Sequence, residues 1–144
     1  MSLIALQADM LTKGISNVDG QEATNRTILL VDDEESVREF VQMLLEGEGY
    51  QVLVAGNGTE ALALYDQYGD EIALVVSDIK MPKMDGVELY RRLSARNKDV
   101  RFIAVSGFMI PESLNQLTTW GLIDIIRKPF SIEVLLQKVE AMLP

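Results

Sequence analysis

Short apolar runs alternate with helix-like segments from residue 27 to the end of the 144-residue chain. The runs are rich in valine, isoleucine and leucine and predict β-strands at 27–31, 51–55, 72–76, 101–105 and 123–126. Apolar residues three and four positions apart predict a helix after each run, near 37–47, 59–68, 87–95, 111–120 and 132–139. This repeat of strand and helix predicts an α/β fold, (βα)5, with a doubly wound five-stranded parallel sheet.

The first and last of these helices have an apolar face that we expect to pack on the sheet. Ser131 is a typical N-cap for the last helix. The apolar faces contain Val37, Phe40, Val41, Leu44 and Leu45 in the first helix, and Ile132, Leu135, Leu136 and Val139 in the last. The strand at 72–76 is the most continuously apolar, as expected for a strand covered by helices on both sides.

Residues 1–26 do not follow this repeat. Their apolar residues are spaced four, three, four and three positions apart, as on a short coiled-coil seam: Ile4, Ala8, Leu11, Ile15 and Val18. Gly14 interrupts the seam, and chain termini are commonly disordered. We therefore expect residues 1–26 to be a flexible leader or a short helix, followed by one domain at 27–144.

Composition removes several classes of function. A net charge of −9 disfavours nucleic-acid binding, because contacts from Lys and Arg to phosphates supply most of the non-specific affinity. The chain has no histidine and no cysteine, which excludes a histidine base, a zinc–histidine site, disulfides and thiol chemistry within it. It has neither a bilayer-length apolar run nor a secretory signal, so we expect a cytoplasmic protein that does not enter the membrane.

Polar residues follow four of the predicted strands. Asp32 and Asp33 follow the first, Asp78 the third, Ser106 the fourth and Lys128 the fifth. Each of these residues alone is common in a loop, but the carboxyl ends of parallel strands meet at one edge of a sheet, where ligands bind. Clustered carboxylates suit Mg²⁺, and a carboxylate can attack phosphorus while a lysine and a hydroxyl neutralise charge. Together these residues indicate a phosphoryl-transfer site.

Four stretches of the chain resemble the response-regulator receiver family: ILLVDDEESVREF, VVSDIKMPKMDGVEL, FIAVSGF and IIRKPFS. The resemblance extends over residues 27–143 and implies the flavodoxin-like strand order 2-1-3-4-5. It also implies that Asp78 is the phosphoacceptor. The implied Mg²⁺ ligands are Asp33, Asp78 and the backbone carbonyl of Lys80, with Asp32 acting through a bound water.

The resemblance assigns roles to residues around the acceptor as well. Ser106 would donate a hydrogen bond to a phosphoryl oxygen, and Lys128 would pair first with Asp78 and then with the phosphoryl group. Pro129 would follow a cis peptide bond. The remaining implied positions are Pro82 and Gly86, which would shape the loop after the acceptor, and Phe108, which could screen the phosphoryl group from water.

One residue departs from the family pattern. Ile125 stands three residues before the lysine, where chemotaxis-type receivers have Tyr or Phe that changes rotamer on activation. Because Ile125 is not a ligand, the phosphorylation chemistry should survive. The Ser-Gly-Phe and Lys-Pro-Phe-Ser segments are similar to those of receivers attached to hybrid sensor kinases.

The resemblance implies a two-component signal-transduction receiver. A sensor histidine kinase or a histidine phosphotransfer protein would donate the phosphoryl group. An output partner would contact the surface of the fourth helix, fifth strand and fifth helix. Such a domain catalyses its own phosphorylation and dephosphorylation but is a switch and not a metabolic enzyme.

Three alternatives are weighed against this interpretation. A flavodoxin-type FMN carrier needs Gly, Ser and Thr donors after the first strand, where this chain has carboxylates. A phosphatase of the haloacid-dehalogenase type would place D-x-D after that strand, whereas the aspartates here are adjacent. A receiver-like module that binds partners without phosphorylation stays open because of Ile125.

Overall fold

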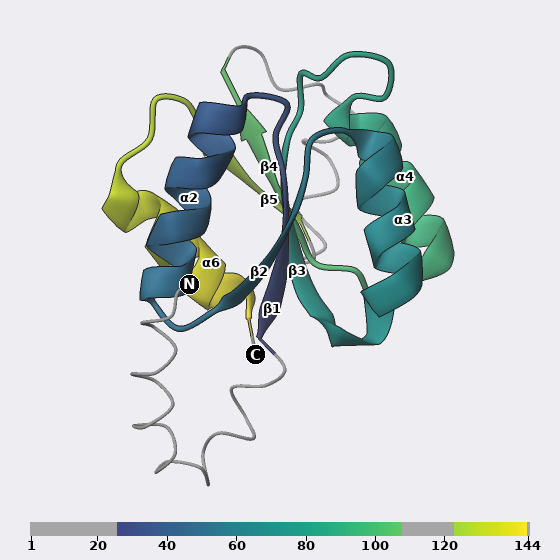
Figure 1. Cartoon of the computed structure of the whole chain (residues 1–144), viewed down its shortest axis with the longest axis horizontal. Helices are drawn as coiled ribbons and strands as arrows, with labels where there is room; N and C mark the ends of the chain where they lie inside the picture. The colour runs from purple at the N-terminus through teal and green to yellow at the C-terminus, as the bar shows by residue number, and fades with distance from the viewer. Residues whose placement is uncertain (1–25, 108–122, 144) are drawn as a thin grey trace, which may run out of the picture.

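Five parallel strands form one sheet in the computed structural model, which describes residues 26–107 and 123–143 (Figure 1). The strands are β1 (Thr27–Val31), β2 (Gln51–Ala55), β3 (Ile72–Asp78), β4 (Phe102–Ser106) and β5 (Ile123–Arg127). Their order is β2-β1-β3-β4-β5, which confirms the expected α/β topology. The predicted strand at 72–76 extends to Asp78, because Asp78 still pairs with Val105 of β4.

Helices cover both faces of the sheet, with α2 and α6 on one face and α3 and α4 on the other (Figure 1). Their bounds are α2 (Glu35–Gly47), α3 (Gly58–Tyr68), the 3-10 turn η2 (Gly69–Glu71), α4 (Gly86–Arg96) and α6 (Ile132–Met142). As predicted, the Ser131 side chain caps α6 by accepting a hydrogen bond from the Val134 N–H. The predicted helix at 111–120 and the leader at 1–25 lie outside the described residues.

The two faces of the sheet carry two separate apolar clusters. One joins the α2 and α6 side through residues such as Leu30, Leu45 and Leu135, and the other joins the α3 and α4 side through Leu29 and Leu89. Neighbouring residues of β1 point to opposite faces, so every residue of this strand is buried. β1 and β3 are neighbours inside the sheet, so the loops that follow them lie side by side.

Two residues predicted to pack on the sheet are instead exposed. Phe40 is 49% exposed and Ile132 is 44% exposed. On α2 the buried contacts are made by Val41 and Leu45, and Phe40 is displaced from Val41 by about 100° around the helix axis. Ile132 is the first residue of α6, at the end of the helix, and the buried contacts come from Leu135 and Val139 further along it.

Among the described residues, no helix combines the length and the apolar character that crossing a membrane requires.

Candidate functional site

Three aspartates meet where β1 and β3 end. Asp32 and Asp33 directly follow β1, and Asp78 is the last residue of β3. One carboxylate oxygen from each of the three lies within 4.8 Å of the others. Asp32 and Asp78 are buried, whereas Asp33 is exposed. These oxygens suit a hard cation that keeps part of its water shell, which is the coordination that Mg²⁺ prefers.

Lys128 supplies a positive charge to this cluster. Its Nζ donates a hydrogen bond to Oδ2 of Asp78 at 3.1 Å, and both side chains are at least partly buried. The backbone N–H of Lys128 also donates to the Ser106 carbonyl at 2.7 Å. As expected, the Lys128–Pro129 peptide bond is cis. The ends of β4 and β5 therefore hold Lys128 beside Asp78.

A cavity of about 900 Å³ opens over these groups. Ser106 lies buried in its wall at the end of β4. Residues from the loops after β1, β3, β4 and β5 line the cavity: Asp33, Glu34, Asp78, Ile79, Lys80, Met81, Asp85, Ser106, Gly107 and Lys128. The structure thus brings the implied metal ligands, Ser106 and Lys128 to one edge of the sheet. The predictions for Ser106, Lys80 and the metal ligands stay predictions, because a shared position does not assign their roles.

Asp32 is held in an environment that opposes its charge. Burial raises the pKa of Asp32 above its ordinary value, and the nearby negative charge of Asp78 raises it further. A hydrogen bond from the Glu34 N–H to Oδ1 of Asp32, at 2.9 Å, acts in the opposite direction. A cation in the cluster would relieve this repulsion, so the electrostatics of Asp32 favour metal binding.

The loop after Asp78 is tightly packed against the end of β3. The Gly86 N–H donates to the Ile79 carbonyl at 2.7 Å. A Cβ atom at Gly86 would lie 2.7 Å from the Asp78 carbonyl oxygen and 2.8 Å from Cα of Ile79, so any side chain there would displace the backbone. The predicted role of Gly86 in shaping this loop follows from these contacts.

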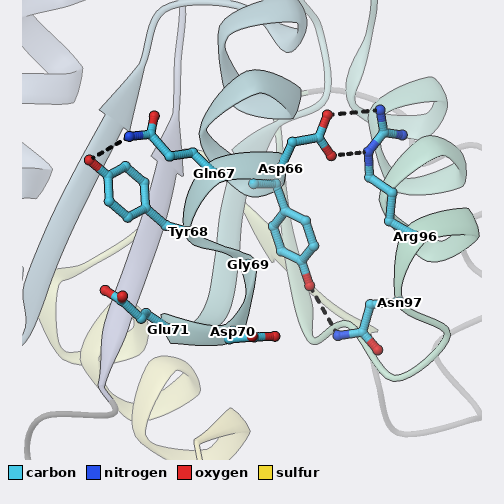
Figure 2. Close-up of a pocket in the computed structure, with 9 residues that line it drawn as sticks. Asp66, Gln67, Tyr68, Gly69, Asp70, Glu71, Arg96 and Asn97 are labelled. Atoms are coloured by element: carbon cyan, nitrogen blue, oxygen red, sulfur yellow. Dashed lines mark hydrogen bonds and ion pairs between the residues drawn. The ribbon is translucent and has the colours of Figure 1, made fainter.

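A second cavity of about 570 Å³ lies at the opposite edge of the sheet, where η2 leads into β3 (Figure 2). Arg96 spans it with hydrogen bonds to both carboxylate oxygens of Asp66, at 2.6 and 3.3 Å. Asn97 donates to the Tyr65 hydroxyl at 3.0 Å. These contacts join α3 to the C-terminal end of α4, at the edge of the sheet opposite Asp78.

Sequence reasoning missed one residue that touches the acidic cluster. Nη1 of Arg38 donates to the backbone carbonyl of Asp32 at 2.7 Å. The only signal in the sequence is an arginine five positions after Asp33 in the following helix, which is also a common surface pattern.

Ile125 is partly buried and packs against the apolar cluster on the α3 and α4 side, and Phe108 lies outside the described residues.

The fold and the site together define a five-stranded parallel α/β domain with an acidic pocket and a paired lysine at its carboxyl edge. Residues 28–140 match the response regulator receiver domain, and the chain belongs to that family.

Two sensor kinases and a solved receiver domain structure are similar to this chain. The sensor kinase CckA of Brucella abortus is 39% identical over 117 residues, covering 81% of this chain and 12% of that protein. The CAI-1 autoinducer sensor kinase/phosphatase CqsS of Vibrio cholerae is 40% identical over 119 residues, covering 81% of this chain and 17% of that protein. This chain therefore spans a small part of either kinase. A receiver domain protein from Clostridium thermocellum superimposes with a TM-score of 0.74 at 27% identity, covering 81% of this chain and 93% of that one.

Proposed function

We propose that residues 27–144 form a two-component receiver in which Asp78 accepts a phosphoryl group in a Mg²⁺-dependent reaction, with residues 1–26 as a leader. The observation that carries the proposal is the position of Asp78. Its carboxylate is buried, lies within 4.8 Å of two other carboxylates and accepts a hydrogen bond from Lys128. Few structural roles require three carboxylates and a lysine at one edge of a sheet.

The residues present fit a magnesium ion. Asp33, Asp78 and the backbone carbonyl of Lys80 would hold it, with Asp32 acting through water, and the ion would neutralise charge on the phosphoryl oxygens. The exposed position of Asp33 and the hollow beside it leave room for the waters that Mg²⁺ keeps.

The chemistry of the chain itself is a displacement at phosphorus. A carboxylate oxygen of Asp78 attacks the phosphorus of a phosphohistidine, an O–P bond forms, and the N–P bond breaks with its electron pair left on the imidazole. Lys128 stays beside the transferred group and balances its negative charge. Attack by water on the same phosphorus returns Asp78 to a free carboxylate, so the domain catalyses both loading and hydrolysis.

Signalling then follows from a shift between two conformations. The phosphoryl oxygens accept a hydrogen bond from the Ser106 hydroxyl, which biases the segment after β4 toward one arrangement. An output partner would read this change on β5 and α6 together with the expected helix at 111–120, which lies outside the described residues. Ile125 of β5 lacks the aromatic ring found in chemotaxis-type receivers, which is the feature that favours the alternative of a phosphorylation-independent interaction module.

The domain would act in the cytoplasm, and its donor would be a sensor histidine kinase or a histidine phosphotransfer protein. Two of the relatives are sensor kinases, which supports a donor of this class. The apolar side chains of Phe40 and Met43, 49% and 62% exposed, lie on α2, the helix that follows the acidic pair, and provide a surface on which a donor can dock.

Intact-mass spectrometry after incubation with acetyl phosphate tests the proposal. We expect one added phosphoryl group that requires both Mg²⁺ and Asp78, and none on Asp78→Asn, which keeps the size of the side chain. An adduct on Asp78→Asn would place the acceptor elsewhere. No adduct from acetyl phosphate or from a phosphohistidine donor, on protein that binds Mg²⁺, would favour the interaction module.

A further inference from the structure

Arg38 makes a short hydrogen bond with the main chain and not with a carboxylate. It lies in the first part of α2, is partly buried, and donates from Nη1 to the Asp32 carbonyl at 2.7 Å. A charged donor to a neutral carbonyl at this distance makes a strong hydrogen bond. The contact therefore acts on the position of the backbone that carries Asp32 and Asp33.

This bond completes the anchoring of Asp32. The Asp32 N–H donates to the Ala55 carbonyl at 3.2 Å, and Oδ1 of Asp32 accepts from the Glu34 N–H at 2.9 Å. With Arg38 on the carbonyl, the amide, the carbonyl and the carboxylate of this residue all have protein partners. Without Arg38, the Asp32 carbonyl loses this partner. Only the hydrogen bonds at the Asp32 N–H and carboxylate would then hold the loop after β1.

Arg38 also reaches the neighbouring loop between β2 and α3. Its Nη1 lies 3.4 Å from the point where a Cβ atom of Gly56 would be, and Oε1 of Glu60 lies 3.5 Å from the same point. Glu60 in turn accepts a hydrogen bond from the Gly56 N–H at 2.7 Å. The guanidinium group thus lies between the loop after β1 and the loop after β2, where it can hold one against the other.

We propose that Arg38 is a positioning residue for the metal site, which sets the geometry of Asp32 and Asp33 through the Asp32 carbonyl. The inference rests on the proposed function, because it takes the acidic cluster as the Mg²⁺ site. Residues that orient metal ligands without touching the metal commonly change affinity by about 10- to 100-fold when they are removed.

Removing Arg38 should change Mg²⁺ affinity in opposite directions, depending on whether Arg38 acts through its charge or by positioning the loop. A positive charge near a cation site weakens cation binding, so its loss should tighten Mg²⁺ binding roughly twofold at physiological salt. Loss of a positioning contact should instead weaken binding about tenfold. The sign of the change therefore separates the two roles.

Isothermal titration with Mg²⁺ in the absence of a phosphodonor, on Arg38→Gln and wild type, measures this sign. Lys83→Gln is the control, because Lys83 is an exposed cation in the loop after β3 at the same edge of the sheet. We expect Arg38→Gln to bind Mg²⁺ about tenfold more weakly. Lys83→Gln should bind as tightly as wild type or slightly more tightly. In labelling by acetyl phosphate, the Mg²⁺ concentration at half the maximal rate should rise for Arg38→Gln, and the maximal rate should change little.

Amide hydrogen exchange without metal is the second measurement. Residues 32–38 should exchange faster in Arg38→Gln than in wild type. Unchanged exchange, or Mg²⁺ binding as tight as in wild type or tighter, would overturn the role of Arg38. If Arg38→Gln does not fold, Arg38→Lys replaces it with the same expected direction, since lysine keeps the charge but lacks the planar fork. Wild type that fails to bind Mg²⁺ would refute the proposed function, and the exchange measurement would still decide whether Arg38 anchors the loop.

Discussion

Asp32 is the residue at which burial and charge oppose each other most directly. Its carboxylate lies within 4.8 Å of two others, and such a pair repels by about 1 kcal/mol even at the dielectric constant of water. Asn has the same shape and can still accept the hydrogen bond from Glu34. Without Mg²⁺ at neutral pH, we expect Asp32→Asn to raise the free energy of unfolding by about 1 kcal/mol. Thermal unfolding measures this, with the exposed Asp99→Asn as the control.

The pH dependence of this effect has a definite sign. The pKa of Asp32 in the folded state is raised. Above the ordinary Asp pKa, the folded state therefore binds a proton at the Asp32 carboxylate more tightly than the unfolded state does. Wild type should therefore lose stability as the pH rises from the ordinary value through the folded pKa, and Asp32→Asn should not show that loss. A variant less stable than wild type at neutral pH would contradict this account.

Gly86 offers a second test at the scale of one residue. A Cβ atom there would meet the backbone of Asp78 and Ile79 at less than 3 Å, and backbone cannot move aside as a flexible side chain can. We expect Gly86→Ala to lower the free energy of unfolding by about 1–3 kcal/mol and to slow phosphorylation of Asp78. Urea denaturation and acetyl phosphate labelling check the two effects.

Gly47 is the matched control for this substitution. It lies at the end of α2, and a Cβ atom would find nothing within 4 Å. Gly47→Ala should be neutral or stabilise the fold by about 0.5–1 kcal/mol, because alanine restricts the unfolded chain more than glycine does. Equal losses of stability in both variants would show that the close packing at Gly86 is not the cause.

At the scale of an element, α2 joins the acidic cluster to an exposed apolar surface. Phe40 and Met43 face solvent on the helix that begins at Glu35, two residues after Asp33. If a donor docks there, Phe40→Ala with Met43→Ala should slow transfer from a phosphohistidine protein about 30-fold, since burying the exposed half of each side chain contributes about 1 kcal/mol. Labelling by acetyl phosphate should stay unchanged, because this small donor needs no docking surface. Equal slowing with both donors would instead point to damage at the site.

At the scale of the whole molecule, metal binding and folding are linked. A ligand that binds only the folded state stabilises it by about 1.4 kcal/mol at ten times its dissociation constant. We expect Mg²⁺ to raise the melting temperature of wild type and to have much less effect on Asp78→Asn. Sodium chloride at equal ionic strength is the control, because screening also stabilises a chain with a net charge of −9. An equal rise in both proteins would argue against the acidic cluster as the site.

Much of the architecture follows from local pattern. Apolar spacing located the strands and helices of the described residues to within about three residues, and the cap at Ser131 is present as predicted. The acidic pair, Asp78, Ser106 and Lys128 meet because every parallel strand ends at the same edge, so the positions of these residues in the repeat were enough to bring them together.

The sequence alone determined which residues form strands and helices and which polar residues gather at the carboxyl edge, because both depend on short-range spacing along the chain. Only the tertiary structure decided that Phe40 faces solvent and that Arg38 holds the Asp32 carbonyl. Strand order, too, had to be inferred from family resemblance until the structure showed it. The physical reason is the same in each case. Contacts between distant segments depend on how the sheet twists and how helices lie across it, and the local pattern does not specify those directions.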